Sequence, residues 1–145
     1  MNTFGDAQGI PVLSKATAEE IGEVKHFVVE NGRVHALHVE GGKHGRLVGW
    51  RDVAFGDDAI VVENADVLRD ANDDREARAM RGELVLMGKR VLSDVGDELG
   101  DLSDVTFEPD DGTIISMLVN GDVIDGERLV GVGSYAVVVR ANRDA

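Results

Sequence analysis

The sequence predicts a mainly β protein made of two small β-barrels in tandem, joined by a short helical connector. Three observations predict this: segments of the first half recur in order in the second, each half holds short β-branched runs between Gly-rich turns, and one helix-forming stretch lies between the halves. Of the 145 residues 43% are apolar, which is typical of a globular chain. We expect the two units at residues 9–64 and 83–141, with the connector at 65–82.

The internal repeat is visible in the letters of the sequence. Arg-Leu-Val-Gly occurs at 46–49 and again at 128–131, and four further pairs of segments match in the same order. In one pair, EEIGEV at 19–24 and DELGDL at 97–102, the acidic, apolar and glycine positions coincide. The five pairs are offset by 79, 78, 80, 82 and 77 residues, so only loop lengths differ. This spacing indicates a tandem duplication of a unit of about 55 residues.

Each unit is predicted to consist of short strands and tight turns. The Asn-Gly pair at 31–32 lies between two β-branched runs and is a strong hairpin signal. The Pro-Asp-Asp-Gly stretch at 109–112 takes the same place in the second unit. Gly22 and Gly100 hold equivalent positions in the two units, and we expect them at bends or bulges of the barrel wall.

The connector is the one stretch of helix-forming composition. Residues 64–82 show no strand alternation and are rich in Arg, Ala, Glu, Leu and Met. Asp73 followed by Glu76 can cap the start of a helix, and the arginines near its end suit the last turn. We expect the polar run at 72–74 to divide the connector into two short pieces.

Charge narrows the classes of partner. The chain carries 28 acidic and 15 basic residues, a net charge of −13, divided as −4 over residues 1–63, −1 over 64–82 and −8 over 83–145. A field of this sign repels phosphates, so we expect no direct nucleic-acid binding and favour a basic protein partner. Because the sequence has no cysteine, no secretory signal and no long apolar run, we expect a cytoplasmic protein without membrane insertion.

No arrangement of side chains predicts catalysis or a cofactor, so we expect no enzyme. Gly-Val-Gly-Ser at 131–134 lacks the lysine of a phosphate loop. Four aspartates miss the order of a calcium-binding loop, and a solvated edge is their simpler interpretation: Asp94, Asp97, Asp101 and Asp104.

All four histidines fall in the first unit: His26, His35, His38 and His44. If the hairpin turns at 31–32 with strict alternation, His26 and His35 lie on one face and His38 on the other. That division disfavours a tetrahedral zinc site, and we expect no metal. Ordinary surface histidines are the simplest interpretation, and a metal site or a pH-tuned partner surface are the alternatives.

Three residues are candidates for partner binding: Trp50, Tyr135 and Val138. Trp50 stands where the second unit has Val132, and it serves either inter-unit packing or binding. We expect Tyr135 to fill the corresponding space in the other unit. Val138 belongs to an apolar run whose outer face needs a cover, from the sister unit or a second chain. We therefore expect a homodimer, with a monomer as the alternative.

The stretch MGKRVLSDVGDELGDLSDVTFEPDDGTI at 87–114 resembles the PRC-barrel. That domain is similar across the cytoplasmic part of the photosynthetic reaction-centre H subunit and the C-terminal part of the ribosome maturation factor of the small subunit. The first unit is a looser match, with His26 where the second has Asp104. The resemblance covers about residues 10–63 and 84–141 and implies tandem barrels that dock on larger assemblies.

Together these observations favour a non-catalytic cytoplasmic adaptor or scaffold that binds a protein partner. Two alternatives from other classes stay open. One is an accessory factor in ribosome or RNA processing that acts through a basic protein. The other is a protein that binds a metal or small ligand through its histidines.

Overall fold

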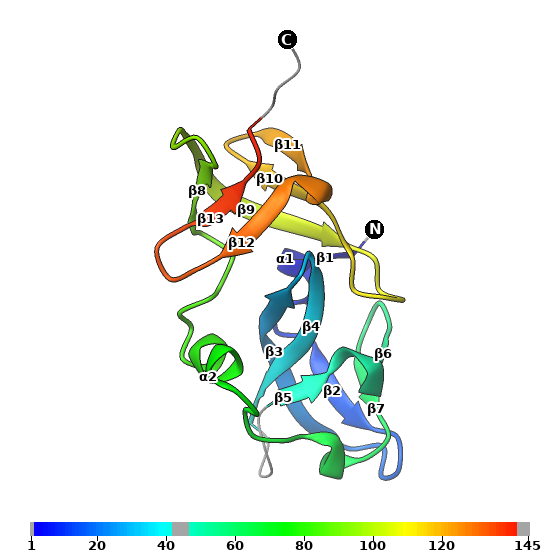
Figure 1. Cartoon of the computed structure of the whole chain (residues 1–145). Coiled ribbons are helices and arrows are strands. Elements are labelled where there is room, and N and C mark those ends of the chain that lie inside the picture. The colour runs from blue at the N-terminus through cyan, green and yellow to red at the C-terminus, as the bar shows by residue number, and fades with distance from the viewer. Residues whose placement is uncertain (1, 42–46, 142–145) are drawn as a thin grey trace.

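The computed structural model describes residues 2–41 and 47–141, so His44 and Arg46 lie outside the described residues. Strands dominate and form two sheets, and both α-helices are short. Figure 1 shows one sheet above the other, with α1 (Phe4–Ala7) between them and α2 (Asp74–Met80) beside the lower sheet. The expected mainly β fold of two small barrels with a short helical connector is confirmed.

The two sheets have the same strand order, β5-β4-β3-β2-β7-β6 in the first and β11-β10-β9-β8-β13-β12 in the second. The first sheet consists of β2 (Pro11–Ser14), β3 (Glu20–Glu30), β4 (Arg33–Glu40), β5 (Leu47–Gly49), β6 (Val53–Phe55) and β7 (Ile60–Val62). The second consists of β8 (Arg90–Ser93), β9 (Glu98–Phe107), β10 (Ile114–Val119), β11 (Asp122–Asp125), β12 (Leu129–Val132) and β13 (Val137–Val139). Three short 3-10 turns accompany them: η1 (Trp50–Asp52), η2 (Ala65–Val67) and η3 (Gly126–Arg128).

One parallel pairing in each unit curls its sheet towards a barrel. The first and last full strands of a unit lie side by side, with Val12 opposite Ile60 and Val91 opposite Val137. All other strand pairs along these two orders are antiparallel. The interior is apolar, because alternate residues of each strand face inward.

Gly22 and Gly100 lie where the strand register shifts, as expected for bulges. A Cβ atom on Gly22 would lie 2.5 Å from Val39 Cγ1, and one on Gly100 would lie 2.7 Å from Asn120 Cβ. Only glycine lets the neighbouring strand approach so closely.

A cluster of aromatic rings joins the two barrels and contains all four phenylalanines and the tryptophan. Phe107 of the second barrel has its ring centroid 5.5 Å from that of Phe4, 5.6 Å from Phe27, 5.2 Å from Phe55 and 5.8 Å from Trp50. Buried residues of both sheets thus belong to one continuous hydrophobic core. The two barrels are packed together, and neither has a separate core.

The N-terminal segment crosses from one barrel to the other. Strand β1 (Asn2–Thr3) precedes the first barrel in sequence yet pairs with β9 of the second, with Thr3 opposite Thr106. The backbone amide of Gly5 donates to Asp104 Oδ1 at 3.0 Å. Phe4 stacks on Phe27 with ring centroids 4.0 Å apart. Residues 2–7 therefore fasten the second sheet to the first.

The tips of two hairpins meet at the other side of this junction. The amide of Val34 donates to the carbonyl of Gly112 at 2.7 Å, and the amide of Ile114 donates to the carbonyl of Gly32 at 3.0 Å. Gly112 has φ +77°, and a Cβ atom there would lie 2.7 Å from Val34 O. The contact therefore requires glycine for both its conformation and its size.

We expect Gly112→Ala to destabilise the protein by about 1–2 kcal/mol more than Gly88→Ala. Gly88 has φ +80° and open space around its Cβ position, so both substitutions incur the same conformational cost and only Gly112→Ala adds the clash. Urea unfolding of the two variants measures the difference. Equal losses would show that the hairpin tips do not pack as described.

Candidate functional site

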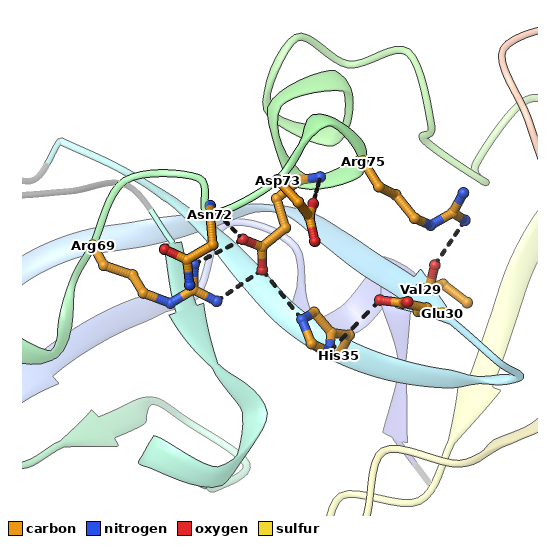
Figure 2. A network of polar contacts seen from close by, with 8 residues as sticks. Val29, Glu30, His35, Arg69, Asn72, Asp73 and Arg75 are labelled. Carbon is orange, nitrogen blue, oxygen red and sulfur yellow. Dashed lines mark hydrogen bonds and ion pairs between the residues drawn. The ribbon is translucent and has the colours of Figure 1, made fainter.

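One buried carboxylate ties the two pieces of the connector together and reaches the first barrel through His35. Glu76 is 2% exposed and accepts two hydrogen bonds from Arg69, each at 2.8 Å. The amide of Asn72 donates to its Oε1 at 2.8 Å, and His35 Nε2 lies 3.2 Å from its Oε2. Figure 2 shows Arg69, Asn72 and His35 converging from three sides.

These donors determine the charge state of the carboxylate. Hydrogen bonding from Arg69 outweighs burial and, with help from Asn72 and His35, lowers the pKa of Glu76 from 4.5 to about 2. The sequence pattern predicted Glu76 only as a capping partner of Asp73. Asp73 does cap α2 by accepting from the amide of Glu76 at 2.8 Å, and the connector does form two short pieces, η2 and α2.

Arg75 links the connector to both sheets, and Lys89 ties the residues that follow the connector to the second sheet. Arg75 Nη2 donates to the carbonyl of Val29 at 3.0 Å and to that of Val132 at 3.4 Å, and Figure 2 shows Arg75 turned towards Val29. Lys89 Nζ donates to the carbonyl of Gly133 at 2.8 Å and to that of Glu83 at 2.7 Å. The connector is therefore a structural brace between the barrels.

The apolar side of the connector covers the outer face of β3, β4 and β5. Ala79 of the connector and Leu84, two residues after it, pack there on Val28, Ala36 and Leu47, and all five side chains are buried. The first barrel thus has both faces of this part of its sheet removed from water.

The histidines are arranged differently from the expectation. His26 lies directly opposite His38 on the neighbouring strand, with ring centroids 5.6 Å apart, so these two share a face and the prediction that separated them is wrong. The cause is a bulge: Val28 pairs with Ala36 but the next residue pairs with Val34, which leaves His35 as an extra residue and reverses the alternation. His44 lies outside the described residues.

Burial governs the chemistry of this histidine pair. His38 is 4% exposed, and Gly82 of the connector lies close to His26. Burial, followed by the charge of Lys25, lowers the pKa of His26. Within residues 2–41 and 47–141, no three His, Asp or Glu side chains are arranged to hold a metal ion.

We expect no stoichiometric zinc in protein purified without an affinity tag, because a tetrahedral site needs four converging ligands. Elemental analysis measures the metal content directly. About one zinc per chain, lost in His35→Ala, would contradict this prediction.

The three predicted partner-binding residues differ in accessibility. Trp50 is 8% exposed and packs on Phe55 and Phe107, so it has the inter-unit packing role that the sequence left open, and its ring is not a surface anchor. Tyr135 is 72% exposed, and its hydroxyl accepts from Arg90 Nη1 at 2.8 Å. The expectation that Tyr135 fills the space equivalent to that of Trp50 is wrong, because the tyrosine lies at the surface. Val138 is half-buried.

The second sheet carries the exposed apolar surface of the described part of the chain. The large apolar side chains exposed there are Val95, Ile115, Leu118, Val123, Val130 and Tyr135. Leu118 and Val123 are direct cross-strand neighbours on β10 and β11. Residues 91–127 contain eleven Asp and Glu and no Lys, Arg or His, so four of these apolar groups, Val95, Ile115, Leu118 and Val123, lie in an acidic stretch. Exposed apolar groups with a charged rim are typical of protein-interaction surfaces.

Residues 2–69 match the model of the PRC-barrel domain. The chain carries a PRC-barrel domain. This domain comprises the β1–α1 segment, the whole first sheet and η2. The second sheet lies outside the match but has the strand order of the PRC-barrel domain. No curated protein matches the chain. In the described part of the chain, no helix is long and apolar enough to span a membrane.

Proposed function

We propose that this protein is a non-catalytic adaptor that binds a protein partner through the exposed acidic and apolar surface of its second sheet. The observation that carries the proposal is the coincidence of exposed Leu118 and Val123 with a stretch, 91–127, that has eleven acidic and no basic residues. Such a surface favours a partner with basic and apolar groups. The match of residues 2–69 to the PRC-barrel domain supports a role of the protein as an interaction module.

The division of labour between the barrels supports the same proposal. The first barrel uses its outer face to hold the connector, and the aromatic junction fixes the second barrel on the first. The second barrel is therefore presented on a rigid base. We propose a cytoplasmic location for this assembly; the alternative role in RNA processing through a basic protein would use the same surface.

Affinity capture from the native source, with chemical cross-linking and mass spectrometry, tests this function. We expect the cross-links to the partner to involve residues of the second sheet, and capture to weaken with salt because the contact is charged. Recovery of no specific partner, or cross-links confined to the first sheet, would contradict the proposal.

Self-association is a separate proposal and rests on another surface. The half-buried Val138 pairs with Leu92 at the centre of the parallel β8–β13 contact, and a second chain would complete its cover. We expect a homodimer that Val138→Asp weakens, measured by light scattering. A mass of one chain over a wide range of concentration would contradict the dimer.

A further inference from the structure

The strand registers establish which residues of the two barrels are equivalent. In the first barrel His26, His38 and Leu47 lie side by side across β3, β4 and β5. In the second barrel the same row across β9, β10 and β11 consists of Asp104, Leu118 and Val123. The next row is Val28, Ala36 and Gly49 in the first barrel and Thr106, Ser116 and Asp125 in the second.

These equivalent faces differ in exposure, because the face of the first barrel is covered and that of the second is open to solvent. In the first barrel His38 is 4% and Leu47 0% exposed, because the connector lies over them with Ala79 and Leu84. In the second barrel the equivalent Leu118 is 38% and Val123 72% exposed. Helix α1 packs beside β9, where the amide of Gly5 bonds Asp104, and it leaves β10 and β11 open.

We infer that the open face of β10 and β11 docks a short, basic amphipathic helix of a protein partner, in the way the first barrel holds the connector. The connector supplies the template: one helix of two turns followed by Leu84, with small apolar groups against the sheet and arginines at 75, 78 and 81 around them. This inference rests on the proposed function and specifies its binding face, named here the β10–β11 face (Ser116, Leu118, Val123 and Asp125).

Charge determines which kind of helix fits. Asp125 is exposed on the same face as Val123, Asp104 ends the row of Leu118 and Val123, and no basic residue occurs between Arg90 and Arg128. Lysine or arginine on the docking helix would find carboxylates around the apolar contact. Two copies of this chain meeting through their β10–β11 faces would instead bring two acidic surfaces together. The occupant is therefore a basic segment of another protein and not a second copy.

The probes are two designed peptides of roughly four helical turns, a length that suffices for measurable helicity. Both carry the same Leu/Ala stripe, and one has lysine and the other glutamate at the remaining positions. Fluorescence anisotropy measures their affinity for the full chain. We expect the lysine peptide to bind at least about tenfold more tightly than the glutamate peptide, with an affinity that falls as salt rises.

Matched variants locate the site. Leu118→Thr combined with Val123→Thr removes apolar contacts on the face, and we expect about a tenfold loss of affinity. Val95→Thr with Val130→Thr alters two equally exposed valines elsewhere and should leave binding unchanged. Asp125→Asn keeps side-chain size and the cap that Asp125 forms on η3, and it should reduce both affinity and its salt dependence. Circular dichroism and urea unfolding confirm that each variant is folded.

The inference would be overturned if the two peptides bound equally. It would also be overturned if the Leu118→Thr, Val123→Thr variant and the Val95→Thr, Val130→Thr variant lost the same affinity. A dimer that the Leu118→Thr, Val123→Thr variant dissociates would overturn it as well, since a second copy would then occupy the face. The same variants separate this inference from the proposed function. A native partner still captured by the Leu118→Thr, Val123→Thr variant would refute the β10–β11 face alone, whereas failure to capture any partner would refute the adaptor function.

Discussion

Phe107→Ala is expected to lower the free energy of unfolding by about 3–5 kcal/mol, the largest loss for any single substitution considered for this chain. Phe107 is 1% exposed and contacts Phe4, Phe27, Trp50 and Phe55, so its removal opens a cavity in the junction of the barrels. Urea or thermal unfolding followed by the fluorescence of Trp50 measures the loss at the junction itself.

Phe107→Leu is the matched control, because it keeps most of the buried volume and should cost less than about 1.5 kcal/mol. The shared core further predicts one unfolding transition for wild-type protein and variant alike. Two transitions, or a loss below that of Phe107→Leu, would contradict a continuous core across the two barrels.

Glu76→Gln is expected to destabilise the protein by about 2–3 kcal/mol at neutral pH, because it leaves the guanidinium of Arg69 without its buried anion. The pKa of Glu76 is lowered in the folded protein from 4.5 to about 2. Its contribution is therefore fully present above the unfolded-state pKa and is lost as the pH falls through that range. We expect the difference in stability between wild type and Glu76→Gln to be constant above pH 4.5 and to close towards about pH 2.

Glu83→Gln provides the control for this effect. Glu83 directly follows the connector and pairs with Arg78 and Arg81, but its side chain is 38% exposed, so its replacement should leave stability nearly unchanged. Equal effects of Glu76→Gln and Glu83→Gln would show that burial of Glu76 does not hold the connector. A difference in stability between wild type and Glu76→Gln that persists unchanged at low pH would likewise show that the buried Glu76 carboxylate does not hold the connector.

The architecture was predictable because it follows from local signals that recur. The Asn-Gly turn at 31–32, the bulge glycines and the interrupted connector all depend on backbone preferences of a few neighbouring residues. Their repetition at near-constant spacing indicated two units of one architecture, and the two sheets do share one strand order.

The N-terminal bridge was not predictable in this way. Residues 2–7 precede both predicted units, because their strand partner lies about a hundred residues away and leaves no local pattern. Phe4 was a signal in retrospect, since an isolated aromatic residue ahead of the first strand needs a buried position.

The histidine pair was missed for a different reason. A single bulge residue, His35, moves His38 to the face of His26, and alternation counted from the turn cannot reveal it. The exposure of Leu118 and Val123 was likewise hidden, because the sequence of a sheet does not state which of two equivalent faces a connector covers.

The accessibility of position 123 in the native complex tests the proposed binding face most directly. The chain contains no cysteine, so Val123→Cys and, as a control, Val95→Cys each introduce a single reactive thiol at an exposed site. Maleimide labelling of the free protein and of the complex captured from the native source gives two rates for each variant. We expect the partner to slow labelling at position 123 at least about tenfold and to leave position 95 unchanged. Equal rates at position 123 in the free protein and in the complex would contradict docking on the β10–β11 face.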